Sequence, residues 1–178
     1  MVVKRKCKAV ILDRDGVINR SIVKKGKPYA PRELKQFIFL PKVKKSINIL
    51  RKKYKIFIVT NQPDINNKLL SKESLKQMND KIKNILKISE IYTCPHTESQ
   101  NCKCRKPKIG LIKKIFEKNN IIINDSFMIG DRKKDIDCGL KAGLKTIFID
   151  RNYREKKPEN YHFKFNNLYQ ASIYINKF

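Results

Sequence analysis

Two aspartates separated by one residue follow an apolar run near the start of the chain. The run covers residues 9–12 and ends at Asp13, and Asp15 lies two positions further on. Side chains two positions apart in extended chain project the same way, and strand ends in an open α/β sheet face the crevice where ligands bind. The pair therefore indicates a carboxylate site, although an isolated Asp-x-Asp is more often a solvated turn.

Polar or charged side chains also follow the other apolar runs and fill one loop. They are Thr60 and Asn61 after a second run, Arg105 and Lys106 in the loop, and Asp131 and Asp135 after a later run. A parallel sheet would bring these strand ends to one edge. Carboxylates suit Mg²⁺, and a hydroxyl with a cation can hold phosphoryl oxygens. The set as a whole favours metal-assisted phosphoryl transfer.

The elements that must position these residues alternate along the chain. Apolar runs predict strands at residues 9–12, 55–59, 90–92, 126–130, 145–150 and 161–165. Helical spacing predicts helices at residues 41–53, 71–87, 108–119, 135–142 and 168–175. Residues 20–40, which contain Gly and Pro, are predicted to form a loop or small flap. This alternation predicts one α/β domain over residues 1–178, with a parallel central sheet covered by helices on both faces.

The chain is strongly basic, with 42 Lys+Arg against 16 Asp+Glu and a formal charge of +26. Such a charge is typical of proteins that bind nucleic acid. The lysines are spread over every predicted surface, however, and the chain is rich in Ile and Asn, so we interpret the charge as compositional bias and do not expect a nucleic-acid partner. The electrostatic field of this positive charge would still attract an anionic substrate.

The chain shows neither the apolar region of a signal peptide nor a run of transmembrane length, which predicts a soluble cytoplasmic protein without a membrane partner. An odd number of cysteines, five, also favours a reducing compartment. The small size of the flap predicts a monomer with an open site.

Four metal-ligating side chains crowd into the loop 94–104. They are Cys94, His96, Cys102 and Cys104. Three thiolates and one imidazole are the tetrahedral set of a structural Zn²⁺ site, and the alternative is a loop of reduced cysteines. Bound zinc would stiffen the loop and fix Arg105 and Lys106, which follow the last ligand, at the rim of the active site.

These groups occur in the order and spacing of the haloacid dehalogenase superfamily of phosphohydrolases, which the chain resembles over most of its length. The resemblance implies a three-layer, Rossmann-like fold with a minimal cap. It also implies that Asp13 is the nucleophile that forms an aspartyl-phosphate and that Asp15 is the general acid and base. Thr60 matches the phosphate-binding position, and Lys106 matches the conserved cation of the family's third motif.

The same resemblance implies a catalytic Mg²⁺. Asp131 matches the direct metal ligand of the fourth motif, beside Asp13 and the backbone carbonyl of Asp15. Asp135 matches a supporting acid that holds a metal-bound water or Lys106. The zinc of the cysteine loop would be structural, since no ligand there is left over for catalysis.

The cysteine loop narrows the resemblance to a subfamily that contains D-glycero-D-manno-heptose 1,7-bisphosphate 7-phosphatases and histidinol-phosphate phosphatases. Residues 12–19 are more similar to the heptose enzymes. This implies hydrolysis of a phosphorylated sugar at its 7-phosphate, with substrate contacts from Asn61, Arg105, Lys106 and Arg132. Histidinol phosphate hydrolysis and a basic nucleic-acid-binding module are the alternatives. Residues 63–68 depart from the Ser-Gly-Ile-Ala-Arg-Gly usual in heptose enzymes, which leaves sugar recognition open.

Overall fold

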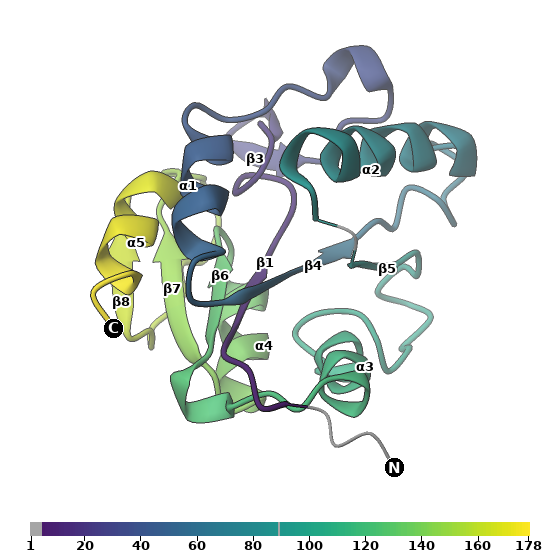
Figure 1. Cartoon of the computed structure of the whole chain (residues 1–178). Coiled ribbons are helices and arrows are strands. Elements are labelled where there is room, and N and C mark those ends of the chain that lie inside the picture. The colour runs from purple at the N-terminus through teal and green to yellow at the C-terminus, as the bar shows by residue number, and fades with distance from the viewer. Residues whose placement is uncertain (1–4, 89) are drawn as a thin grey trace.

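A six-stranded sheet forms the centre of the computed structural model, which describes residues 5–88 and 90–178 (Figure 1). Its strand order is β5-β4-β1-β6-β7-β8, and each neighbouring pair is parallel. The strands are β1 (Ala9–Leu12), β4 (Lys55–Asn61), β5 (Ile91–Cys94), β6 (Phe127–Gly130), β7 (Lys145–Ile149) and β8 (Phe163–Phe165). The predicted parallel α/β fold is confirmed, whereas the extent of the domain stays a prediction.

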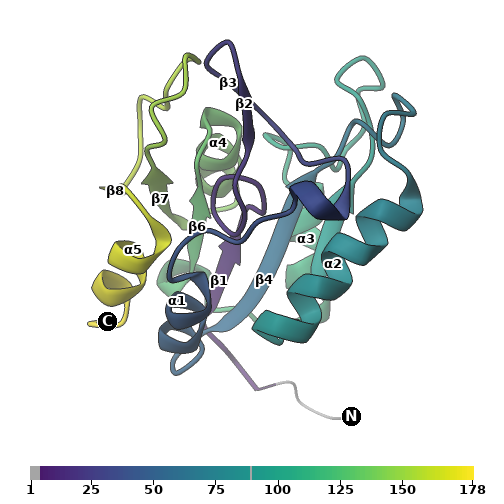
Figure 2. The same ribbon diagram turned by 90° about the horizontal axis from the view of Figure 1, so that it is seen from above.

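Helices cover both faces of the sheet (Figure 2). One face packs against α1 (Val43–Leu50), α2 (Lys72–Leu86) and α5 (Leu168–Ile175). The opposite face packs against α3 (Gly110–Lys118) and α4 (Lys133–Lys141). Side chains of a strand alternate between the two faces, so Val10 and Leu12 enter the first core and Ile11 enters the second. A strand buried on both faces explains the unbroken apolar run that precedes Asp13.

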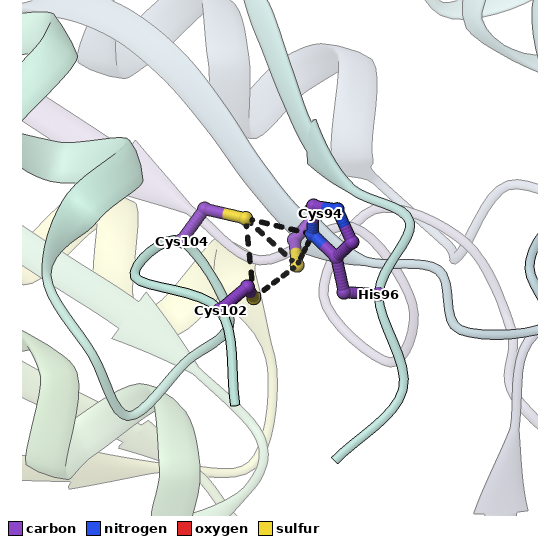
Figure 3. A group of neighbouring side chains, drawn as sticks. All are labelled: Cys94, His96, Cys102 and Cys104. Atoms are coloured by element: carbon purple, nitrogen blue, oxygen red, sulfur yellow. Dashed lines mark hydrogen bonds between the residues drawn. The ribbon is translucent and has the colours of Figure 1, made fainter. Parts of the chain in front are cut away.

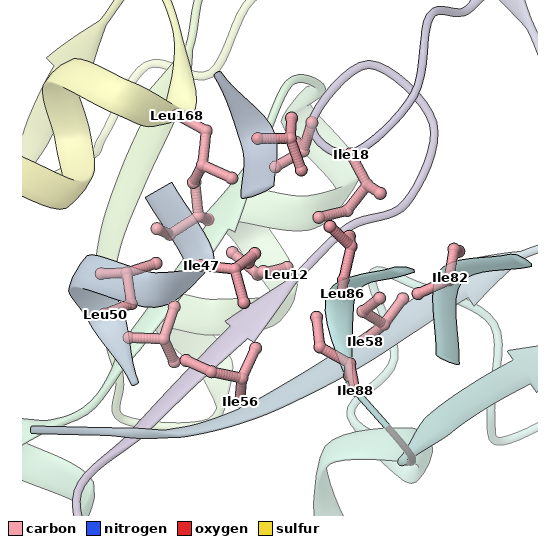
Figure 4. Packing of buried hydrophobic residues seen from close by; sticks show 14 of the residues in the cluster. Leu12, Ile18, Ile47, Leu50, Ile56, Ile58, Ile82, Leu86, Ile88 and Leu168 are labelled. Atoms are coloured by element: carbon pink, nitrogen blue, oxygen red, sulfur yellow. The ribbon is translucent and has the colours of Figure 1, made fainter. Parts of the chain in front are cut away.

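The first core is the larger of the two. In it, Leu12 and Ile58 of the strands meet Ile47 of α1, Leu86 of α2 and Leu168 of α5 (Figure 4). Full burial of one such side chain contributes about 1.5–3 kcal/mol to folding. This packing fixes the strands, and with them the strand ends that carry the candidate site.

Helix α4 begins two residues earlier than predicted, at Lys133. Asp135 therefore lies in its first turn, where its Oδ2 accepts a hydrogen bond of 3.1 Å from the backbone N–H of Arg132. A Cβ on Gly130, at the end of β6, would lie 2.1 Å from the Cβ of Asp135. Glycine is thus required there, because it lets the helix bring Asp135 close to the strand end.

Residues 20–40 are more ordered than the predicted loop or flap. They contain the antiparallel hairpin of β2 (Ile22–Lys24) and β3 (Lys27–Tyr29), followed by the 3₁₀ helix η1 (Leu34–Gln36). Lys25 and Gly26, the two turn residues, have φ values of 50° and 79°, as a tight two-residue hairpin turn demands. No helix in the described part of the chain is both long and apolar enough to cross a membrane.

Candidate active site

A buried lysine joins two of the predicted strand ends. The Nζ atom of Lys106 lies 2.5 Å from Oδ1 of Asp13, after β1, and 2.6 Å from Oδ1 of Asp135, after β6. It also donates a hydrogen bond of 2.9 Å to the carbonyl of Val59 in β4. The side chain of Lys106 is only 3 % exposed, so these contacts form away from water. The strand ends therefore meet as the sequence predicts.

Three carboxylates cluster at this point, and two of them, those of Asp13 and Asp135, contact the ammonium group. Asp13, Asp131 and Asp135 place oxygens within 4.8 Å of one another, and all three residues are buried. Among the described residues, no lysine or arginine forms an ion pair with Asp131, whose carboxylate interacts with the Tyr153 hydroxyl. When all three are ionised, two negative charges stay uncompensated. Hard oxygen donors with this excess charge fit a divalent cation such as Mg²⁺.

The carboxyl pKa values reflect this crowding. Burial raises the pKa of Asp13 to about 7, although the Lys106 ammonium opposes the shift. Burial also raises the pKa of Asp131 well above its usual range, and the charges of Asp13 and Asp135 raise it further. Conversely, the carboxylates raise the pKa of Lys106, which stays protonated. The cluster thus holds protons near neutral pH that a bound cation would displace.

Asp15 accepts hydrogen bonds from three side chains. Arg14 approaches both of its oxygens at 3.0–3.2 Å, Asn19 donates to Oδ1 at 2.9 Å, and Gln62 donates to Oδ2 at 2.7 Å. Gln62 also donates to Oγ1 of Thr60 at 2.8 Å. These donors fix the orientation of the Asp15 carboxylate.

Asn61 positions the backbone of Lys106. Its Oδ1 accepts from the Lys106 N–H at 3.1 Å, and its Nδ2 donates to the Lys106 carbonyl at 3.2 Å. The amide therefore forms a two-way bridge between the end of β4 and the loop that carries the buried cation.

A cavity of about 310 Å³ lies above the cluster. Its walls include every predicted catalytic or substrate-binding residue, namely Asp13, Asp15, Thr60, Asn61, Arg105, Lys106 and Arg132. The hairpin adds Lys27 and Tyr29, which the sequence did not assign to the site. Asp131 is absent from this lining and is almost completely buried.

The two arginines predicted to contact the substrate already have protein partners. Arg105 donates from one terminal nitrogen to the carbonyl of His96 at 3.1 Å. Arg132 forms two parallel contacts with Glu155, which also lines the cavity. Nothing in the sequence around Glu155 signals this role, because the contact joins segments 23 residues apart.

The four predicted zinc ligands lie together (Figure 3). The Cys104 Sγ is 3.1 Å from the Cys94 Sγ, 3.4 Å from the Cys102 Sγ and 3.2 Å from the His96 Nδ1. Corners of a tetrahedron with Zn–S bonds of about 2.3 Å lie about 3.8 Å apart. The three cysteines form no disulfide, and the fourth ligand is the imidazole of His96. The four donors fit a zinc ion if the distances between them increase slightly.

Comparisons with known proteins show which family the chain belongs to. The family described as polynucleotide kinase 3 phosphatase matches residues 8–167. The chain is 32% identical over 163 residues to the D-glycero-beta-D-manno-heptose-1,7-bisphosphate 7-phosphatase of Helicobacter pylori strain J99, covering 86% of this chain and 89% of that protein. The chain belongs to the polynucleotide kinase 3 phosphatase family. It is therefore an enzyme that hydrolyses phosphate monoesters.

Further relatives support the same assignment. The D-glycero-alpha-D-manno-heptose-1,7-bisphosphate 7-phosphatase of Campylobacter jejuni is 33% identical over 169 residues, which cover 92% of each chain. A crystal structure of D,D-heptose 1.7-bisphosphate phosphatase from B. bronchiseptica, complexed with magnesium and phosphate, has a TM-score of 0.83 and 22% identity, covering 96% of this chain and 98% of that one. This structural likeness confirms the fold.

Removal of the buried cation tests the charge balance of the cluster. At about pH 8, Lys106→Met should lower the free energy of unfolding of the metal-free protein by about 3–5 kcal/mol, because buried carboxylates lose their partner. The loss should be smaller at about pH 5, where Asp13, with its raised pKa, is already protonated and neutral. Urea denaturation at the two pH values measures both quantities.

Lys134→Met is the matched control. Lys134 also lines the cavity but pairs with Glu98, whose side chain is 79 % exposed. Its loss should cost less than about 1 kcal/mol and should not depend on pH over this range. Equal losses in the two variants would contradict the assignment of Lys106 as the cation of the cluster.

Proposed function

We propose that the protein is a Mg²⁺-dependent sugar-phosphate phosphatase that acts on D-glycero-D-manno-heptose 1,7-bisphosphate at its 7-phosphate. The observation that carries the proposal is the buried cluster of Asp13, Lys106 and Asp135 beneath a cavity lined with cations. The names of the sequence relatives support the choice of substrate. We further propose that the enzyme is a cytoplasmic monomer, as expected from the sequence.

Asp13 is the proposed nucleophile. Its ionised carboxylate attacks phosphorus, the bond from phosphorus to the sugar oxygen breaks, and an aspartyl-phosphate forms. Lys106, in contact with Asp13, and Thr60, which lines the same cavity, hold phosphoryl oxygens during the transfer. Because burial raises the pKa of Asp13, its carboxylate depends on nearby positive charge, such as that of Lys106, to stay ionised.

Asp15 is the proposed general acid and base. It gives a proton to the departing sugar oxygen and then takes one from the water that hydrolyses the aspartyl-phosphate, so that free phosphate leaves, the Asp13 carboxylate is restored and the proton that Asp15 gave is replaced. The three donors from Arg14, Asn19 and Gln62 hold its carboxylate in one orientation. Gln62 couples that orientation to Thr60.

Two metal sites belong to the proposal. Asp13, Asp131 and the backbone carbonyl of Asp15 would hold Mg²⁺, with Asp135 in support. When bound, Mg²⁺ neutralises the charge of the phosphoryl group and orients it. Zn²⁺ at the four loop ligands would be structural, and it would steady Arg105 through the carbonyl of His96.

Substrate contacts are proposed for Asn61, Arg105, Lys106 and Arg132, all of which line the cavity. Cations at the rim suit a substrate that carries a second phosphate group. The atypical residues 63–68 contribute Pro63 and Asp64 to the same wall, where a carboxylate can accept hydrogen bonds from sugar hydroxyls.

Turnover of a defined panel tests the choice of substrate. The panel contains both anomers of the heptose 1,7-bisphosphate, histidinol phosphate and a 3′-phosphorylated oligonucleotide, each with Mg²⁺. We expect kcat/KM for one heptose anomer to exceed that for the last two compounds by on the order of 100-fold, because only the sugar satisfies the polar walls. A preference for histidinol phosphate or for the oligonucleotide would replace the proposed substrate.

Two aspartate variants serve as controls for the panel. Asp13→Asn should lower kcat on every active substrate by at least about 10³-fold, because the nucleophile is lost. Asp80→Asn removes the charge of a half-exposed aspartate of α2 that pairs with Lys76 and Lys83, and it should leave kcat unchanged. Retained activity in Asp13→Asn would refute the assignment of the nucleophile.

Metal analysis tests the zinc site. We expect zinc to copurify with the wild-type protein and to be lost in Cys104→Ser, since four ligands are needed for a closed site. Loss of zinc should also lower kcat/KM, because the loop no longer steadies Arg105. Cys7→Ser, which changes a cysteine outside the cluster, should retain both zinc and activity. A wild-type protein without zinc would rule out the site.

A further inference from the structure

The ion pair between Arg132 and Glu155 occupies one side of the catalytic cavity. Arg132 Nε lies 2.9 Å from Glu155 Oε2, and its terminal nitrogen lies 2.6 Å from Oε1. Both residues line the cavity. A guanidinium binds a phosphate through the same pair of parallel hydrogen bonds that it forms with a carboxylate. Glu155 therefore takes the face of Arg132 that a phosphate group would use.

The pair lies at the rim of the cavity and not at its floor. The side chains of Arg132 and Glu155 are 39 % and 24 % exposed, whereas that of Lys106 is 3 % exposed. The phosphate that is transferred must reach Asp13 at the floor, next to Lys106. Arg132 is thus placed for a part of the substrate that stays closer to solvent.

The loop that carries Glu155 is anchored on the hairpin. The backbone N–H of Arg154 donates to the carbonyl of Gly26 at 2.8 Å. A Cβ on Gly26 would lie 2.6 Å from two side-chain carbons of Arg154, so the hairpin turn rests directly on this residue. The hairpin tip and the segment after β7 lie side by side (Figure 2).

The same loop is also anchored at its base. Asp150 follows β7 and accepts hydrogen bonds from the Asn152 N–H at 2.9 Å and from Lys157 Nζ at 2.8 Å. It pairs with Lys164 as well, at 2.9 Å. With contacts at both its base and its tip, the loop holds Glu155 in place against Arg132.

We propose that Glu155 is a specificity-determining residue that competes for Arg132 with the phosphate group that is not transferred. This inference rests on the proposed function, because it concerns a substrate with two phosphates. Glu155 neutralises Arg132 in the free enzyme, so a second phosphate must displace the carboxylate before it binds. In a chain of formal charge +26, such a contact limits the retention of anions at the mouth of the site.

Glu155→Gln tests this competition, because it keeps the size of the side chain and removes its charge. KM for the heptose bisphosphate should fall by about three- to tenfold, since Arg132 becomes free to bind the second phosphate. KM for phenyl phosphate, which has one phosphate group, should change by less than about twofold. An unchanged or raised KM for the bisphosphate would overturn the proposal.

Two further variants distinguish the release of Arg132 from a general effect of the changed net charge. Glu159→Gln makes the same charge change close by, at an exposed residue that pairs with Lys156, and should alter neither KM. In an Arg132→Ala background, Glu155→Gln should lose its effect, because the residue that it frees is gone. An equal fall in KM for Glu159→Gln would assign the effect to bulk charge and overturn the proposal.

Inhibition by pyrophosphate tests the role of Glu155 without a sugar substrate. Pyrophosphate should inhibit phenyl phosphate hydrolysis more strongly in Glu155→Gln than in the wild type, by the same about three- to tenfold. The enzyme could fail to hydrolyse the heptose bisphosphate and still be inhibited more strongly by pyrophosphate in the Glu155→Gln variant. That result would refute the proposed substrate and support the role of Glu155. Equal inhibition of the two enzymes would overturn that role.

Discussion

The contact of buried Lys106 with Asp13 and Asp135 is the interaction on which the rest of the site depends. A charged side chain is costly to bury unless opposite charges and hydrogen bonds surround it. Here two carboxylates and the carbonyl of Val59 surround the ammonium. Because the partners come from the ends of β1 and β4 and from the first turn of α4, this requirement sets the register of strands, loop and helix together.

The single ammonium group of Lys106 does not balance the charge of the carboxylates around it. Asp131 adds a third carboxylate but forms no ion pair with a lysine or arginine among the described residues. In the absence of a metal, burial raises the pKa values of Asp13 and Asp131, so protons supply part of the missing charge. A divalent cation bound by these carboxylates would replace those protons and leave Asp13, the proposed nucleophile, ionised. In the proposed mechanism, metal binding and activation of Asp13 would therefore be one electrostatic event.

Much of this architecture can be predicted from the sequence. Apolar runs that end in polar residues mark strands of a parallel sheet, and such strands deliver Asp13, Thr60 and Asp131 to a common edge. The sequence predicts the hairpin only as a flap, because two strands of three residues each are too short to show a clear alternation. The start of α4 is hard to predict from the sequence, because Arg132 is an unusual residue to precede a helix.

Other features depend on contacts that local sequence does not encode. The donors that surround Asp15 include the fully buried Arg14, although arginine is rarely found inside a protein. Glu155 reaches Arg132 only because the hairpin and the loop after β7 meet in space. The sequence could identify chemistry at strand ends, but the tertiary arrangement decides which of those groups are already paired.

Proton release on Mg²⁺ binding tests the central claim most directly. Calorimetric titration of the metal-free protein in two buffers of different ionisation enthalpy gives the number of protons released. Near the pKa of Asp13, about 7, we predict a net release of protons and an affinity that rises with pH, because the ion displaces protons from buried carboxyls. Binding without proton release, with an affinity independent of pH, would contradict the account.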